Sequence, residues 1–197
     1  SPYWETGVYC NGEMMHKTVS LLCNSSLYAL EEELRKGFLT LPGGHRTGFV
    51  GRAVLERGRV RTLKQISGVN IRIARYIPGS AVKIIRHLII AKGTEQRPIP
   101  ANTLIISPPR AGKTTLLRDI ICLFSDGFYG FSAIDVGLVD ERSEIAGCRE
   151  GIPQLPIGHR TDVLDGCPKA EGMMMLVRSM SPQVIATDEI GRQEDAD

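Results

Sequence analysis

The sequence lacks the features that mark membrane-spanning, secreted and zinc-binding proteins. No apolar run approaches the ~20 residues that a membrane span requires, and the start of the chain is neither basic nor followed by an apolar core. The five cysteines are odd in number and have no C-x-x-C spacing, and the four histidines are scattered. These absences predict a cytoplasmic protein with reduced thiols and without a structural zinc site.

Acidic residues are scarce in one part of the chain. The 197 residues carry a net charge of only +2, yet residues 43–97 hold twelve Lys or Arg against two Glu. A segment this basic predicts an anionic partner, which could be nucleic acid, acidic lipid or the acidic half of a neighbouring subunit. With 42% hydrophobic residues, the chain is long enough for a medium domain and a smaller one.

Residues 1–98 are predicted to form the smaller domain, which is of α+β class. A serine that can cap a helix, Ser25 or Ser26, precedes leucines at helical spacing, which predicts a helix that ends at Gly37. Residues 41–44 are predicted to form a turn. Alternating apolar residues then predict strands over 47–55, 60–63 and 69–75. A second helix from Ser80 would bury Val82, Ile85, Leu88 and Ile89. Residues 93–100 are polar and contain two prolines, so a linker and a domain boundary near residue 98 are predicted.

The second domain, residues 99–197, opens with the most informative stretch of the chain. The apolar run Leu104–Ile106 predicts a strand, a loop ending in Gly112-Lys113-Thr114-Thr115 follows, and a helical apolar period begins at Leu116. Strand, loop and helix form the context in which a G-x-x-x-x-G-K-[ST] loop, the Walker A motif, holds phosphates. Ser107 replaces the first glycine of that pattern. The alternative is a Gly-Lys-Thr turn before an ordinary helix.

The residues of this loop have separate chemical roles. Pro108 and Pro109 have no N–H to donate, so a triphosphate would be held by later main-chain N–H groups and by the helix N-terminus. Lys113 would reach the β- and γ-phosphates, and the Thr114 hydroxyl would bind Mg²⁺. The predicted cofactors are ATP and Mg²⁺, and the nucleotide-binding residues are Ser107, Arg110, Ala111, Gly112, Lys113, Thr114 and Thr115.

A phosphate loop of this kind predicts a strand tipped with carboxylates, the Walker B motif. The apolar run from Val184 ends in Asp188 and Glu189. Asp188 would hold Mg²⁺, and Glu189 would polarise the attacking water. The alternative is a buried strand that happens to end in two acids.

A second acidic strand end is predicted after residues 134–139. Asp140 and Glu141 follow this apolar run, and strand ends of an open parallel sheet face the ligand crevice. Glu141 therefore joins Glu189 and Lys113 as a predicted catalytic residue. The alternative for residues 140–144 is an acidic helix N-terminus.

The remaining segments predict one loop and one helix. Residues 151–166 contain two prolines and three glycines, which indicates an irregular loop. Residues 169–180 have helical period, and Pro182 ends the helix. Its predicted buried face comprises Met173, Leu176, Val177 and Met180. Arg178 lies off that face and is a candidate for stabilising charge, with a plain surface arginine as the alternative.

Four blocks, residues 106–120, 139–146, 160–172 and 180–192, together with the basic segment 45–75, resemble the stage III sporulation protein AA family of endospore-forming bacteria. The resemblance implies a RecA/AAA+-like P-loop NTPase with a parallel-sheet core, related to the type II and type IV pilus secretion motors. It also implies a hexamer with nucleotide at the subunit interfaces. Residues 140–142 match the family's acidic box beside the γ-phosphate.

The implied function is a mother-cell ATPase, cytoplasmic or peripheral at the membrane. It would energise or gate the channel to the forespore, and its partners would be the channel proteins. An arginine of the same or a neighbouring subunit would stabilise the γ-phosphate, and the candidates are Arg72, Arg75, Arg142, Arg160 and Arg178. The rivals are a nucleic-acid-binding ATPase that uses the basic segment and a scaffold that binds ATP with slow turnover.

The sheet topology of such motors makes a further prediction about length. In that topology the strand after Walker B lies between the Walker A and Walker B strands. Only nine residues follow Asp188. We therefore expect a core truncated at its C-terminal end and low turnover by these 197 residues alone.

Overall fold

The computed structural model describes residues 9–23, 34–35, 37–90 and 98–190. Contacts divide the chain into unit 1, Ser1–Leu41 and His45–Ala74, and unit 2, Pro42–Gly44 and Arg75–Asp197. The division thus falls at residue 74, whereas the sequence predicts a boundary near residue 98. Most of the predicted helix that ends at Gly37 lies outside the described residues.

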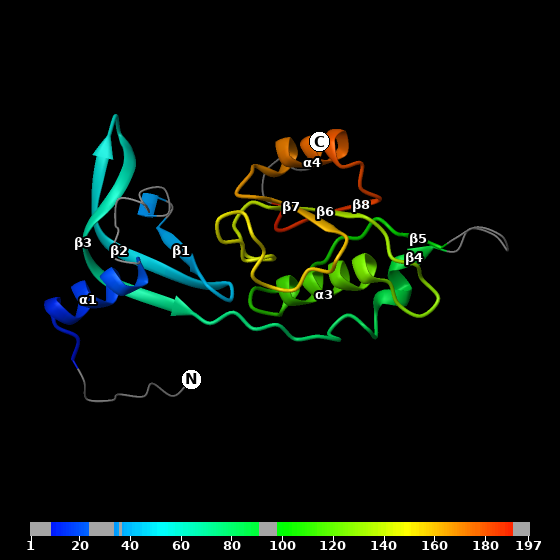
Figure 1. The fold of residues 1–197 in the computed structure, drawn as a ribbon, viewed down its shortest axis with the longest axis horizontal. Coiled ribbons are helices and arrows are strands. Elements are labelled where there is room, and N and C mark those ends of the chain that lie inside the picture. The colour runs from blue at the N-terminus through cyan, green and yellow to red at the C-terminus, as the bar shows by residue number, and fades with distance from the viewer. Residues whose placement is uncertain (1–8, 24–33, 36, 91–97, 191–197) are drawn as a thin grey trace. The chain divides into compact units, whose positions relative to one another are not determined.

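Unit 1 is an antiparallel sheet with one helix. The sheet has the order β1-β2-β3, with β1 at Phe38–Leu41, β2 at His45–Glu56 and β3 at Arg59–Arg72 (Figure 1). Helix α1, Gly12–Leu22, starts at Asn11, whose side chain accepts the Met14 N–H. Together α1 and the sheet bury Val19, Cys23, Leu34, Leu39 and Phe49.

The strands of unit 1 differ from those that the sequence predicts. The predicted strands 60–63 and 69–75 fall on one strand, β3, which ends at Arg72, because a bulge between Val50 and Arg52 lets the ladder with β2 continue. Gly51 is needed in that bulge, since a Cβ there would lie 2.8 Å from the Lys64 carbonyl oxygen. β1 was not predicted, because four residues are too few to show a period.

Unit 2 contains a parallel sheet of three strands in the order β7-β6-β8. Its strands are β6, Val136–Asp140, β7, Thr161–Asp165, and β8, Val184–Thr187. Figure 1 shows α3, Lys113–Asp126, and α4, Lys169–Ser179, on opposite faces of this sheet. Central β6 is buried along its whole length, as expected for a parallel strand covered on both faces.

Two expectations for the start of unit 2 are corrected by the structure. The predicted helix from Ser80 is one short turn, η2 at Ile85–Leu88, which leads into β4, Ile89–Ile90, and its antiparallel partner β5, Ile99–Pro100. Ile85 is buried, but Val82 is 57% exposed. The Asp119 carboxylate explains the turn, because it accepts the N–H groups of Gly79 and Ala81. These contacts also tie residues 79–88 to unit 2.

The segment before the phosphate loop also differs from expectation. Residues 104–106 do not form a strand in the structure, and Leu104 and Ile106 are 67% and 83% exposed. Conversely, β7 lies inside the predicted loop 151–166. Helix α4 matches its prediction, although only Leu176 of the predicted face is fully buried, while Val177 and Met180 are about half exposed. Within the described ranges, no helix is long and apolar enough to cross a membrane.

Candidate functional site

Helix α3 begins directly after the loop that the sequence singles out. Its N-cap is Gly112, which has φ 90° and ψ 15°, and no side chain caps the first turn. A left-handed backbone of this kind favours glycine. The first N–H groups of a helix have no partner within it, and they carry partial positive charge. The start of α3 therefore offers a donor set suited to an anion.

Lys113 is held against the loop by hydrogen bonds to the main chain. Its ammonium donates to the carbonyl oxygens of Ser107, at 2.9 Å, and Pro108, at 3.1 Å. The loop also contains Arg110, whose φ of 64° is uncommon for a residue other than glycine. Thr114 and Thr115 lie half-buried in the first turn of α3. The predicted nucleotide-binding residues thus share one compact turn.

Hydrogen bonds fix the direction of α3 relative to the sheet. Near its start, Arg118 donates to the carbonyl oxygens of Glu144 and Ile145, which follow the carboxyl end of β6. At its end, Ser125 accepts the Arg160 N–H, just before the amino end of β7. The phosphate loop therefore lies toward the carboxyl ends of the parallel strands. At this end, Asp140 is the last residue of β6 and Glu141 follows it, and Asp188 and Glu189 follow β8.

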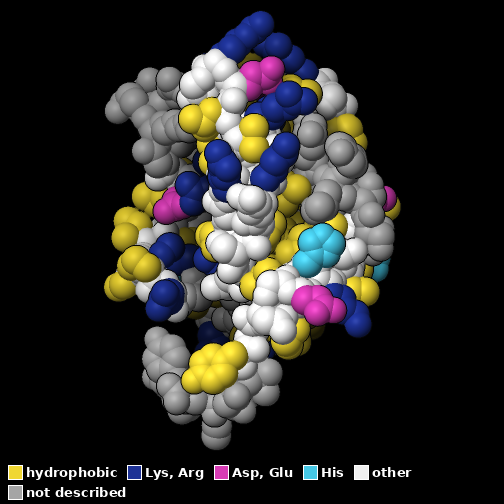
Figure 2. All heavy atoms as spheres, turned by 90° about the vertical axis from the view of Figure 1, so that its left-hand side faces the viewer, with side chains coloured by type: hydrophobic (Ala, Val, Ile, Leu, Met, Phe, Trp, Pro, Cys, Tyr) yellow, Lys and Arg dark blue, Asp and Glu magenta, His cyan; other side chains and the backbone are white. Residues whose placement is uncertain are grey.

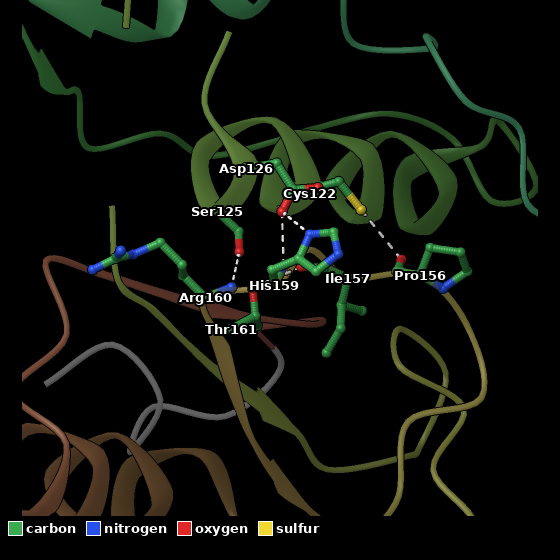
Figure 3. Close-up of polar contacts among 8 residues, drawn as sticks. All are labelled: Cys122, Ser125, Asp126, Pro156, Ile157, His159, Arg160 and Thr161. Carbon is green, nitrogen blue, oxygen red and sulfur yellow. Dashed lines mark hydrogen bonds and ion pairs between the residues drawn. The ribbon is translucent and has the colours of Figure 1, made fainter. Parts of the chain in front are cut away.

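Figure 3 shows the contacts at the far end of α3. Asp126 accepts hydrogen bonds from the His159 main chain, at 2.7 Å, and contacts the His159 ring, at 2.9 Å. Gly158 passes so close to Ser125 that a Cβ would lie 2.4 Å from the serine Cβ. Arg160 also pairs with Asp135 at 2.9 Å. Since this cluster lies at the amino end of β7, the structure does not bring Arg160 to the acidic strand ends.

Asp188 follows β8 and is largely buried. Its side chain is 10% exposed, and its Oδ1 is buried without a hydrogen-bond partner in the described parts of the chain. Burial raises the pKa of Asp188, and Lys169 partly opposes that shift. A buried carboxylate oxygen with no hydrogen-bond donor is an unusual arrangement, and it suits a residue whose partner is a cation.

Glu189 has the opposite character. Its side chain is 68% exposed, and it accepts a hydrogen bond from Arg142 at 2.8 Å. The next residue along the chain, Ile190, is about half exposed. Of the five candidate arginines, Arg142 is therefore the one that the structure brings to a predicted catalytic residue. Arg72 is exposed in unit 1, whereas Arg75 and Arg178 are exposed in unit 2.

Asp140 does not face a ligand crevice, contrary to the expectation for the acidic tip. It is fully buried and accepts three N–H groups, those of Glu144, Ile145 and Ala146, at 2.8 to 3.0 Å. Burial raises its pKa, and these three donors oppose the shift. The residues after it form turns, so the alternative of an acidic helix N-terminus also does not hold. Asp140 shapes the turn that carries Glu141 and Arg142.

Lys169 is a member of this site that the sequence analysis missed. It is the first residue of α4, and its side chain is only 7% exposed. Its ammonium contacts a Glu141 carboxylate oxygen and lies 3.6 Å from Asp188 Oδ1. A lysine in the first turn of a helix opposes the helix dipole. That unfavourable position was the available signal.

The acidic strand ends fit a magnesium ion. Among the described residues there is no group of three or more His, Cys, Asp or Glu that could hold a metal. Magnesium, however, commonly binds one or two carboxylates and completes its shell with water and substrate phosphate oxygens. The buried Oδ1 of Asp188, which accepts no hydrogen bond from the described residues, and the nearby Glu141 provide that kind of donor set.

Comparisons with known proteins bear on the family. Residues 4–197 match the family model described as sporulation stage III, protein AA. Stage III sporulation protein AA of Bacillus subtilis (strain 168) is 52% identical over 185 residues, which are 94% of this chain and 58% of that protein. The chain thus spans less than two thirds of the length of that relative.

Two more distant relatives come from a plant and a red alga. Protein SEEDLING PLASTID DEVELOPMENT 1 of Arabidopsis thaliana is 32% identical over 77% of this chain and 20% of its own length. The uncharacterized protein ycf45 of Porphyra purpurea is 32% identical over 66% of this chain and 21% of its own length. No solved structure matches the chain. With nearly all of its residues covered by the family model, the chain belongs to the sporulation stage III protein AA family.

Proposed function

We propose that this chain is the ATP-binding part of a P-loop ATPase of RecA/AAA+ type that acts in sporulation. The observation that carries the proposal is the start of α3 at Gly112-Lys113, which no side chain caps. It lies toward the carboxyl ends of the parallel strands, where Asp188 and Glu189 also lie. A phosphate group and a metal ion must meet at one place for phosphoryl transfer. Membership in a sporulation family supports the cellular setting.

Several residues of the site would each have a task in ATP hydrolysis. The N–H groups at the start of α3 would bind phosphate oxygens, and the Lys113 ammonium would turn from the Ser107 and Pro108 carbonyls to the γ-phosphate. Mg²⁺, held by Thr114 and Asp188, would neutralise charge on the phosphate oxygens. Glu189 would orient the attacking water after it leaves Arg142. Arg142 would then stabilise the γ-phosphate.

The wider role is part of the same proposal. A motor of the secretion type would work as a hexamer, peripheral to the membrane on the mother-cell side, and would energise or gate a channel to the forespore. The support is the resemblance of residues 106–120 and 180–192 to those motors and the match to the sporulation relative.

Steady-state ATP hydrolysis tests the assignment of Glu189. We expect low but measurable phosphate release by the chain with Mg²⁺, and about a hundredfold less by Glu189→Gln, a typical effect of losing a general base. Glu150→Gln is the matched control, because Glu150 is also an exposed glutamate of unit 2. Equal rates in wild type and Glu189→Gln would remove Glu189 from the mechanism.

A second candidate function is the binding of a nucleic acid strand by unit 1. Residues 45–72, the β2–β3 hairpin, carry seven Arg or Lys and one acid, Glu56. Figure 2 shows basic side chains crowding the end of this hairpin, with few carboxylates. Exposed apolar side chains, including Val50 and Leu55, lie among them. Salt-sensitive binding of single-stranded DNA would support this function, and no binding at low salt would contradict it.

A further inference from the structure

Lys169 occupies a position that is unfavourable for a lysine in two ways. Its side chain is 7% exposed, so its charge has lost most of its hydration. It also lies at the first residue of α4, where the positive end of the helix dipole repels a cation. A buried charge of this kind is tolerated only with close, opposite partners.

The partners come from two neighbouring strands. Glu141 follows β6 and Asp188 follows β8, and these strands are paired in parallel. Lys169 begins α4 shortly after β7, the other neighbour of β6. The ammonium contacts Glu141 directly, whereas Asp188 Oδ1 is 3.6 Å away and accepts no hydrogen bond from the described residues. Glu141 thus has a direct contact with the ammonium, whereas Asp188 has a longer ion pair with it.

We propose that Lys169 is a resident counter-ion that competes with a divalent cation for the carboxylates of Glu141 and Asp188. The identity of that cation as Mg²⁺ rests on the proposed ATPase function, but the competition itself does not. An ammonium at this distance from Asp188 repels any metal ion that approaches the same oxygen. Free divalent cations therefore bind poorly to the empty protein.

The competition has a consequence for the order of binding. A metal ion that arrives with a polyphosphate brings negative oxygens that can accept the displaced ammonium of Lys169. A free metal ion brings no such acceptor, and it is repelled by the ammonium that lies next to Asp188. The site therefore selects the metal–nucleotide complex over the free metal.

Titration of nucleotide-free protein with Mn²⁺, followed by electron paramagnetic resonance, tests the proposal. Wild type is expected to bind Mn²⁺ weakly, and Lys169→Gln roughly tenfold or more tightly, since a repelling charge is gone. Lys169→Arg keeps the charge and should resemble wild type. Lys83→Gln is the matched control, because Lys83 is an exposed lysine of unit 2. Adding Asp188→Asn to Lys169→Gln should abolish the gained affinity.

Thermal unfolding gives a second readout. Lys169→Gln should melt below wild type in EDTA, because two carboxylates then repel each other, and Mn²⁺ should restore its melting temperature. If Lys169→Gln is unfolded in EDTA, refolding by Mn²⁺ in circular dichroism supports the proposal, and failure to refold contradicts it. Mn²⁺ affinity that is equal in Lys169→Gln and Lys83→Gln, or equally raised in Lys169→Arg, overturns it.

The outcome is separable from that of the ATPase proposal. Binding of a fluorescent ATP analogue to the wild-type chain is measured in parallel. Loss of nucleotide binding with intact Mn²⁺ competition would remove the ATPase proposal and leave the counter-ion role of Lys169. Nucleotide binding without Mn²⁺ competition would remove the counter-ion role of Lys169 and leave the ATPase proposal.

Discussion

Unit 1 exposes its charges along a hairpin, whereas unit 2 buries several of its charges at the ends of parallel strands. Four arginines of the hairpin are exposed to solvent: Arg52, Arg57, Arg59 and Arg61. Salt screens the field of such charges, and their side chains are not held in one position. Asp140, Arg118 and Lys169 are each at most 6% exposed, and each has specific partners. The hairpin therefore suits an extended polyanion, and the strand ends suit a compact, defined ligand.

The largest effect is expected from the most deeply buried of these charges. Asp140→Ala removes the acceptor of three N–H groups and leaves Arg118 without its nearby carboxylate. We expect a loss of roughly 3 to 5 kcal/mol in the free energy of unfolding, measured by urea unfolding with circular dichroism. The control Glu150→Gln, in which the replaced side chain is 83% exposed, should change it by less than about 0.5 kcal/mol. A loss below about 1 kcal/mol for Asp140→Ala would contradict the role given to this carboxylate.

The contact at the far end of α3 should be nearly as sensitive. Gly158→Ala combines a φ of 87° with a Cβ placed 2.4 Å from Ser125 Cβ, so a loss of about 3 kcal/mol is expected. Gly151→Ala has a similar φ, 76°, in open space, and about 1 kcal/mol is expected there. Similar losses in the two variants would show that the close approach to Ser125 does not matter.

The hairpin should show the reverse behaviour. Replacing Arg57, Arg59 and Arg61 by Gln should leave the unfolding free energy within about 0.5 kcal/mol. If the hairpin binds single-stranded DNA, the slope of log affinity against log salt should fall by about 2. The control replaces Arg75, Lys83 and Arg86, which are exposed cations of unit 2, for the same change in charge. Equal loss of binding in both triple variants would assign the effect to net charge alone.

The smallest perturbation is chemical labelling of thiols, which changes no residue. Burial raises the pKa of Cys148 to about 12, so only roughly one molecule in ten thousand would carry its thiolate at pH 8. Cys10 is exposed. Iodoacetamide at pH 8 should therefore modify Cys10 rapidly, and Cys148 only when unit 2 opens. Rapid modification of Cys148 in the folded protein would show that the strand ends are less closed than described.

Local patterns predicted the elements that depend on local order. Helices α3 and α4 and the strands β6 and β8 lie close to their predicted ranges, because long helical periods and continuous apolar runs are strong signals. These elements also placed Asp188 and Glu189 at a strand end. The roles of those residues in ATP hydrolysis remain predictions.

Contacts between distant residues account for what the sequence did not reveal. β7 lies in a stretch rich in glycine and proline, and only its pairing with β6 makes it a strand. The sequence predicts a helix from Ser80, because the carboxylate that instead accepts the N–H groups of Gly79 and Ala81 belongs to Asp119, 38 residues beyond Ala81. Lys169 and Asp140 acquire their roles only when three strand ends meet. A periodic pattern along the sequence carries no information on contacts between residues that are distant in the chain.

The central claim is that the loop before α3 binds the phosphates of ATP. Isothermal titration calorimetry of the chain with ATP and Mg²⁺ tests this claim most directly. We expect saturable binding by wild type and a loss of roughly tenfold or more in affinity for Lys113→Ala, with both proteins folded by circular dichroism. Lys83→Ala should bind as wild type does. Equal affinities in wild type and Lys113→Ala, or no binding by the folded wild-type chain, would contradict the account.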